Sequence, residues 1–213
     1  MDLHRQNTVC PRVIPFHLDD WASAAEAFKK STPVYLGQHW LPQPEAGFLP
    51  ARVRTTWTDN ALLVLAELDD AGIFNPSREF NAPAFKMGDI FEIFLRPIDQ
   101  DAYYEFHIGP DNQKFQLRVP SAKAFRELPK GDIPQEWLIG NQVIESRAKV
   151  LAQDNRWLAL ASIPFAMVAE ARHPEAGSQW LFSFSRYDYH PGNPSPTLSS
   201  SSAHEMPVSF HRQ

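Results

Sequence analysis

Short segments that alternate apolar and polar residues recur along this chain, and sequences typical of tight turns separate them. The alternation predicts strands at 52–57, 61–68, 89–96, 103–108, 114–119, 143–152, 156–163 and 179–187. Thr58-Asp59-Asn60, Gly109-Pro110-Asp111-Asn112 and Asp154-Asn155 form turns between neighbouring segments. Strands that follow one another through short turns pair antiparallel. The sequence therefore predicts an all-β fold of two stacked antiparallel sheets.

Helical sequence is scarce in this chain, which has 19 prolines against 9 glycines. Proline interrupts helices but is tolerated in turns and at strand ends. One short helix is predicted from Trp21 to Lys30, with Asp19 or Asp20 as its N-cap. A second helix is predicted after Ile163, with Pro164 at its first position.

Two stretches lack a strand pattern and are predicted to be loops. Residues 120–141 form a long excursion, and residues 191–202, rich in proline and serine, form a mobile loop. Trp40 and Trp137 border proline-containing loops and are candidates for exposure. Trp157 and Trp180 lie in alternating segments and are predicted to pack in the core.

Composition narrows the classes of partner. The 213 residues are 43% hydrophobic, enough for a sizeable core, and we expect one domain spanning residues 1–213. Twenty Lys and Arg against 25 Asp and Glu give a net charge of −5, which offers no attraction to nucleic acid or to an anionic membrane surface. The only cysteine, Cys10, has no partner for an internal disulfide, and the eight histidines show no zinc-binding spacing.

The first residues contain no apolar run of signal-peptide length, and no stretch approaches eighteen consecutive apolar residues. The sequence as given is therefore expected to be a soluble, cytoplasmic protein. It would instead be periplasmic or secreted if a signal peptide had been removed.

Four stretches carry a more specific pattern, and they follow one another in a fixed order. They are Trp57-Thr58-Asp59-Asn60-Ala61-Leu62-Leu63-Val64, Gly88-Asp89-Ile90-Phe91-Glu92-Ile93-Phe94-Leu95, Tyr103-Tyr104-Glu105-Phe106-His107-Ile108-Gly109-Pro110 and Trp157-Leu158-Ala159-Leu160-Ala161-Ser162-Ile163-Pro164-Phe165. With closing segments at 184–187 and 209–211, the chain from about residue 50 to 211 resembles the family 9 carbohydrate-binding module and its relatives among the DOMON-like β-sandwiches.

This resemblance implies an immunoglobulin-like or jelly-roll sandwich with one or two short helices. It also implies a non-catalytic sugar-binding role with an oligosaccharide or polysaccharide as ligand, and a glycan-degrading enzyme as partner. The best-known members grip a sugar end between two tryptophans and can carry structural calcium. In this chain Phe85-Lys86-Met87 stands where the first tryptophan is expected, and Tyr187, Tyr189 and His190 stand near the place of the second.

Sugar recognition needs flat apolar rings against pyranose C–H groups, with charged or amide groups that pair with adjacent hydroxyls. The candidate carbohydrate-binding residues on this basis are Phe85, Lys86, Glu92, Gln113, Arg118, Arg186, Tyr187, Tyr189 and His190. Glu92 shares a strand face with Ile90 and Phe94, so it should be partly buried and need a partner. We expect Arg118 or Arg186 to fill that role, and structural pairing and ligand contact remain equal alternatives.

Other functions stay open at this stage. A DOMON-like haem-binding electron-transfer domain would use Met87 with His107 or His190 as axial ligands. A structural accessory domain would use its aromatic residues as interface anchors. Glu92 and Glu105 could act as an acid and base pair, but no nucleophile elbow or phosphate-binding loop accompanies them. Asp69 and Asp70 could donate oxygens to a structural calcium ion, although a turn role is the simpler interpretation.

Overall fold

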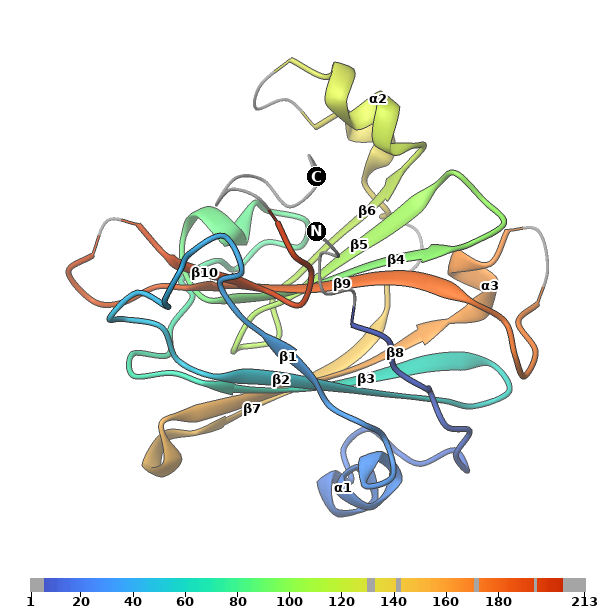
Figure 1. Cartoon of the computed structure of the whole chain (residues 1–213), viewed down its shortest axis with the longest axis horizontal. Coiled ribbons are helices and arrows are strands. Elements are labelled where there is room, and N and C mark those ends of the chain that lie inside the picture. The colour runs from blue at the N-terminus through green and yellow to red at the C-terminus, as the bar shows by residue number, and fades with distance from the viewer. Residues whose placement is uncertain (1–5, 130–132, 141–142, 171–172, 194, 205–213) are drawn as a thin grey trace.

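The computed structural model describes residues 6–129, 133–140, 143–170, 173–193 and 195–204. These residues form two stacked five-stranded antiparallel sheets, which confirms the predicted all-β sandwich (Figure 1). Sheet A contains, in spatial order, β1 (Val34–Leu36), β2 (Ala51–Trp57), β3 (Ala61–Asp69), β8 (Arg156–Pro164) and β7 (Glu145–Leu151). Sheet B contains β10 (Thr197–Ser200), β9 (Trp180–Asp188), β4 (Ile90–Pro97), β5 (Tyr103–Ile108) and β6 (Lys114–Val119).

The main core lies between the two sheets and follows from the alternation of side chains along each strand. Its fully buried members include Val64 and Trp157 of sheet A and Phe91, Phe106 and Phe184 of sheet B. Trp157 is therefore a core residue, as predicted. Every second residue of a core strand is left to face outward, so each sheet also needs cover on its outer face.

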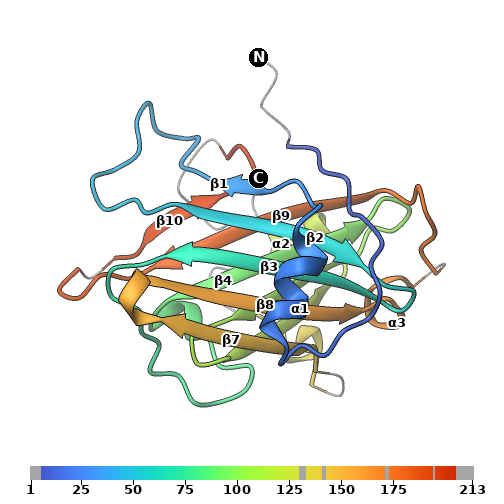
Figure 2. The ribbon, with the colours of Figure 1, turned by 90° about the horizontal axis from the view of Figure 1, so that it is seen from below.

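Helix α1 (Trp21–Phe28) covers the outer face of sheet A, as Figure 2 shows from below. The carboxylate of Asp20 accepts hydrogen bonds from the backbone N–H groups of Ala22 and Ser23 and so caps the helix. Phe28 packs with Leu18 against the outward residues of β3 and β8. The predicted helix and one of its two predicted caps are confirmed.

The chain between β6 and β7 covers one end of the outer face of sheet B. It contains α2 (Ala122–Glu127) and the 3₁₀ helix η2 (Gln135–Trp137). Trp137 is 9% exposed and packs with Phe115 and Leu117 of β6, so the expected exposure of Trp137 is wrong. The segment has enough apolar residues to form a satellite core of its own. Short elements also follow β7 and β8, namely η3 (Ala152–Asp154) and the predicted helix α3 (Phe165–Val168).

The two sheets are joined at one edge by short strands that the sequence did not reveal. Strand β10 lies within residues 191–202, where we expected a mobile loop, and it pairs with β9 from Thr197 to Ser200. Backbone hydrogen bonds of 2.9 Å run both ways between Gly37, directly after β1, and Ser200 of β10. The predicted closing segment at 209–211 lies outside the described residues.

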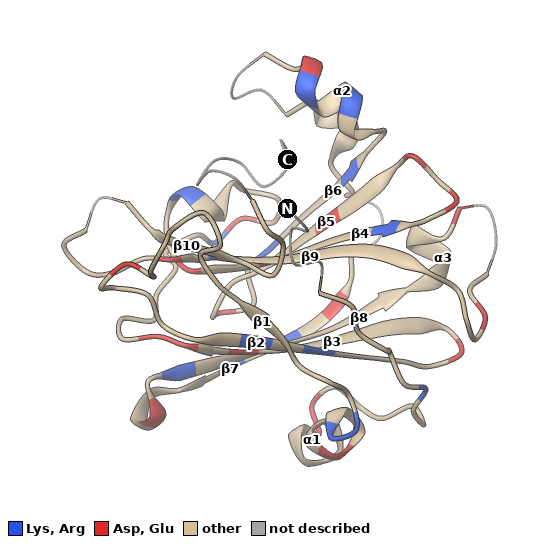
Figure 3. Ribbon diagram, in the orientation of Figure 1, with Lys and Arg blue, Asp and Glu red and all other residues tan. Residues whose placement is uncertain are grey.

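Charged residues are distributed over loops, strand edges and helices, and the two signs are mixed (Figure 3). In this view of the described residues, Lys and Arg lie on several elements, including α2, β2 and β7, rather than in one stripe. None of the described helices is long and apolar enough to cross a membrane.

Candidate functional site

The outer face of sheet B that α2 leaves uncovered carries both polar and aromatic side chains. Phe91 and Ile93 of β4 point into the core, so Glu92 between them points outward. Glu92 pairs across the sheet with His107 on β5 and with Ser185 on β9. Cross-strand partners share a face, so these three side chains lie together on the outer surface of the sheet.

A pocket of about 580 Å³ opens at one end of this face. It lies between the loop after β1, the 3₁₀ helix η1 (Ala84–Lys86) and the paired strands β9 and β10. Its rings come from Trp40, Phe85, Tyr187 and Tyr189, its aliphatic wall includes Leu41 and Leu198, and its polar groups come from Gln38, Glu45, Lys86 and Ser195. Small-molecule sites commonly have this volume and this mixture of rings with a few polar groups.

The aromatic wall of the pocket is fixed by its neighbours. The rings of Phe85 and Tyr187 lie 5.9 Å apart, and the Tyr189 hydroxyl donates a 2.9 Å hydrogen bond to the Phe85 carbonyl. The ammonium of Lys86 lies 5.7 Å from the centre of the Phe85 ring. Rings held in this way present flat faces without the entropy cost of ordering free side chains.

The opposite wall comes from the loop after β1. Gln38 is 5% exposed and donates to the Glu45 carboxylate and to the Leu198 carbonyl. Its own amide oxygen accepts the backbone N–H of Glu45 at 2.9 Å. These bonds link Gln38 to Glu45 within the loop and attach the loop to β10. Trp40 lies between Gln38 and Glu45 in the sequence.

The Gly88-Asp89 pair of the sequence pattern connects this pocket to the sheet. The Asp89 carboxylate accepts backbone N–H groups from Phe74, at 2.6 Å, and from Tyr189, at 2.8 Å. Burial, and then the neighbouring Asp70 carboxylate, raise the pKa of Asp89 to about 7, although the two N–H donors oppose the rise. Asp89 thus joins β4, the chain before η1 and the end of β9, and it places Tyr189 at the pocket.

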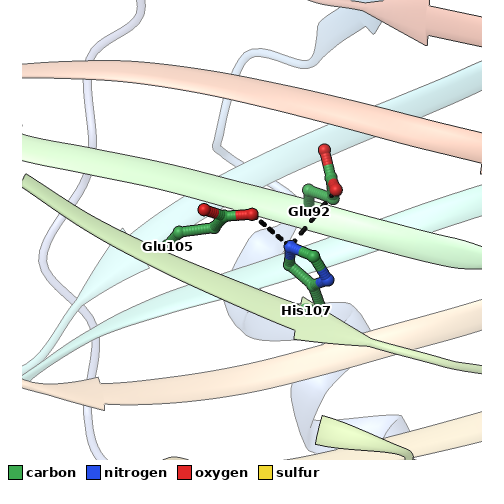
Figure 4. Close-up of side chains that lie close together, drawn as sticks. All are labelled: Glu92, Glu105 and His107. Carbon is green, nitrogen blue, oxygen red and sulfur yellow. Dashed lines mark hydrogen bonds and ion pairs between the residues drawn. The ribbon is translucent and has the colours of Figure 1, made fainter. Parts of the chain in front are cut away.

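Beneath the Phe85 ring lies a buried cluster of Glu92, Glu105 and His107, drawn in Figure 4. The Nε2 atom of His107 contacts the carboxylates of both glutamates, with 3.2 Å to Glu92 Oε1. All three side chains are at most 4% exposed. Burial raises the pKa of Glu92 to about 8; His107 opposes the rise and the charge of Glu105 adds to it. The expected Arg partner of Glu92 is therefore wrong, and a histidine takes its place.

Arg186 lies on the other face of sheet B, because its cross-strand partner on β4 is Phe91 rather than Glu92. It is fully buried, and its Nη2 atom lies 3.0 Å from Asp70 and 3.1 Å from Asp188. Burial and then Asp70 raise the pKa of Asp188 to about 6, while Arg186 lowers it. Asp70, one of the residues suggested for calcium, thus has a guanidinium as its partner here.

The remaining predicted sugar contacts also lie away from the pocket. Arg118 pairs with Tyr104 across the sheet, on the core-facing side, and binds the carboxylate of Glu170. Gln113 donates a 2.8 Å hydrogen bond to the Asn75 carbonyl, which is a loop contact. His190 lies 3.1 Å from the Gly47 carbonyl. The structure brings Phe85, Lys86, Tyr187 and Tyr189 together and places Glu92 in the layer beneath them.

Sequence reasoning missed the contribution of the loop after β1. Trp40 was noted only as a candidate for exposure, and Gln38 and Glu45 were not considered. The only signal was a tryptophan beside a proline-containing loop, and this does not show which strand the loop folds against. The haem hypothesis stays a prediction; Met87 is 41% exposed, whereas His107 is 1% exposed and engaged by the two glutamates.

Comparisons with known proteins give matches at the level of structure. No family model and no curated protein sequence matches this chain. A candidate carbohydrate-binding protein from Bacteroides uniformis superposes with a TM-score of 0.68 and 12% identity, over 96% of this chain and 93% of that one. A family 9 carbohydrate-binding module from Caldicellulosiruptor kristjanssonii in complex with cellotriose superposes with a TM-score of 0.56 and 17% identity, over 90% of this chain and 80% of that one.

A family 9 carbohydrate-binding module from the same organism in complex with glucose superposes with a TM-score of 0.53 and 17% identity, over 90% of this chain and 82% of that one. This chain has a fold like that of the family 9 carbohydrate-binding module (CBM9). The superpositions cover 90% or more of this chain. The resemblance drawn from the four sequence stretches is confirmed for the fold.

Proposed function

We propose that this protein is a non-catalytic carbohydrate-binding module that holds a sugar in the pocket between Trp40 and the Phe85–Tyr187 rings. The observation that carries the proposal is the gathering of four aromatic side chains and Lys86 around one open pocket. The CBM9-like solved structures, one bound to cellotriose and one to glucose, support this class of ligand.

The chemistry of the pocket matches a pyranose ring. Aromatic faces pack against sugar C–H groups, and the ring hydroxyls need donors and acceptors at the rim. Lys86 supplies donors, whereas Glu45 and Ser195 supply acceptors from the opposite side. A cavity of about 580 Å³ accommodates a mono- or disaccharide unit, so we expect recognition of the end of a longer chain.

Calorimetric titration with glucose, cellotriose and a panel of oligosaccharides tests the proposal. We expect binding in the micromolar to millimolar range, and Trp40→Ala should weaken it by roughly tenfold or more, about 1.4 kcal/mol. Lys86→Ala should weaken binding less, because a rim charge contributes less than a stacked ring.

Tyr35→Ala is the matched control, since Tyr35 is an aromatic residue of β1 that is 56% exposed and does not line the pocket. Its affinity should equal that of the unmodified protein. The proposal fails if no sugar binds at millimolar concentration, or if Tyr35→Ala and Trp40→Ala weaken binding equally.

A further inference from the structure

Glu92, Glu105 and His107 direct their donor atoms at one point on the outer face of sheet B. One carboxylate oxygen from each glutamate and a ring nitrogen of His107 all lie within 4.8 Å of one another. Figure 4 shows both carboxylates turned toward the same imidazole. The three residues come from two paired strands, so the sheet itself sets their positions. Positions fixed by a rigid element are those from which a precise ligand set is built.

Glu92 is the residue whose environment is incomplete. It is 3% exposed, and its Oε2 atom has no hydrogen-bond partner among the described residues. Its one ion-pair contact in the described part of the chain is His107. A buried carboxylate oxygen without a donor costs free energy that a bound cation would remove.

The second buried carboxylate cluster shows the contrast. Asp70, Asp89 and Asp188 also bring donor atoms within 4.8 Å of one another, but there the guanidinium of Arg186 stands among them. That cluster contains its own permanent cation. The Glu92 cluster offers an imidazole instead, which, unlike a guanidinium, can release its proton and then bind a metal ion.

We propose that Glu92, Glu105 and His107 bind one divalent transition-metal ion of the Zn²⁺ class. Two carboxylate oxygens and one imidazole nitrogen are a ligand set used for Zn²⁺ and for neighbouring first-row ions. Ca²⁺ takes six to eight oxygen ligands, which this nitrogen-containing set of three does not provide. The ion would lie under the Phe85 ring, whose centre is 5.5 Å from that of His107, and would stiffen the floor of the pocket.

Titration of the chelator-treated full-length protein with Zn²⁺, followed by calorimetry, tests this inference without any sugar present. We expect one equivalent of Zn²⁺ to bind and to raise the melting temperature. Co²⁺ should give visible absorption bands typical of mixed oxygen and nitrogen coordination. Glu92→Gln and His107→Gln should each lower the Zn²⁺ affinity by about tenfold or more.

Asp188→Asn is the control, because it removes a carboxylate from the cluster that contains Arg186. It should leave the Zn²⁺ affinity and the Co²⁺ spectrum unchanged. The inference is overturned if the unmodified protein binds no stoichiometric Zn²⁺, or if Asp188→Asn abolishes binding while Glu92→Gln retains it. Circular dichroism checks that each variant is folded, and Glu105→Gln replaces whichever of the two ligand variants is not. Sugar titrations of the metal-free protein report on the proposed function separately.

Discussion

Gly88 is packed so closely that no side chain fits at its position. A Cβ atom there would lie 2.4 Å from the Phe74 carbonyl oxygen and 2.7 Å from the Cα atom of Asn75. Both neighbours are backbone atoms, which cannot turn away as a side chain can. The close approach brings the Phe74 N–H to the Asp89 carboxylate, so the glycine and the aspartate of the pattern act together.

Gly88→Ala should therefore lower the free energy of unfolding by about 1–3 kcal/mol, the usual cost of forcing atoms into a packed site. Gly140→Ala is the control, because a Cβ atom there meets nothing within 4 Å. Urea denaturation measures both. Equal stability of the two variants would contradict the packing argument.

At the scale of elements, hydrogen bonds to Gln116 and Asn81 attach the end of the long connection between β6 and β7, in addition to its satellite core. Gln116 of β6 is fully buried; its amide nitrogen donates to the Ile139 carbonyl at 3.1 Å, and its amide oxygen accepts the Ile144 N–H at 2.8 Å. Its own backbone N–H donates to Asn81. Gln116 thus hydrogen-bonds the residues that lie just before β7.

Gln116→Leu should loosen this segment, because the buried Ile144 N–H loses its acceptor at a cost of roughly 1–3 kcal/mol when it stays dry, whereas the Ile139 carbonyl keeps the Asn81 amide at 3.2 Å. Amide hydrogen exchange at Ile144 should become faster than in the unmodified protein. Gln135→Ala removes an exposed glutamine of the same connection and should leave that rate unchanged. Protection at Ile144 that survives Gln116→Leu would show that other contacts hold the segment.

The sequence predicted the elements that have enough residues to show a period. Eight strands and two helices were predicted within a few residues of their observed bounds. For the strands, apolar and polar residues that alternate over six or more positions indicate which face is buried. Strands β1 and β10 have three and four residues, too few to show alternation, and β10 lies among serines and prolines that indicate a loop.

The site was harder to predict because it depends on register. Glu92 lies opposite His107 on β5 and Ser185 on β9, and a shift of one residue in the pairing of β4 with β9 would place Arg186 opposite it instead of Ser185. Alternation shows that Glu92 faces away from Phe91, but it does not show which residues of other strands share that face. The contribution of Trp40 depends on a loop that folds onto a strand more than 150 residues later, which no local pattern records.

At the scale of the whole molecule, buried carboxyl groups make the balance of charge sensitive to pH. Asp89 and Asp188 have pKa values raised to about 7 and about 6, whereas unfolded aspartates titrate near their ordinary value of about 4. At pH values between the unfolded and the folded pKa of each aspartate, the folded protein holds more protons than the unfolded chain. Stability conferred by a raised carboxyl pKa is therefore lost as pH rises. Burial raises the pKa of Glu67, but Arg52 and Arg54 together lower it further, so Glu67 acts in the opposite sense, and only at acidic pH.

We predict that the free energy of unfolding, measured by urea in the presence of a chelator, falls between pH 5 and pH 7.5 by an amount on the order of 1–3 kcal/mol. Asp188→Asn should make the fall between pH 5 and pH 6 smaller but not abolish it, because Asp89 also contributes over that interval. Stability that rises over this range would show that the two aspartates are ionised throughout.

The bridge between Gly37 and Ser200 has a consequence for how a ligand would enter. Trp40 follows Gly37 by three residues, and its loop therefore starts from a point bonded to both layers of the sandwich. Because the loop is hydrogen-bonded where it begins, we expect that it does not open and close as a flap does. Free and liganded forms should then superpose closely in the backbone around the ring of Trp40, and selectivity should come from a shape that is already present before the proposed ligand binds.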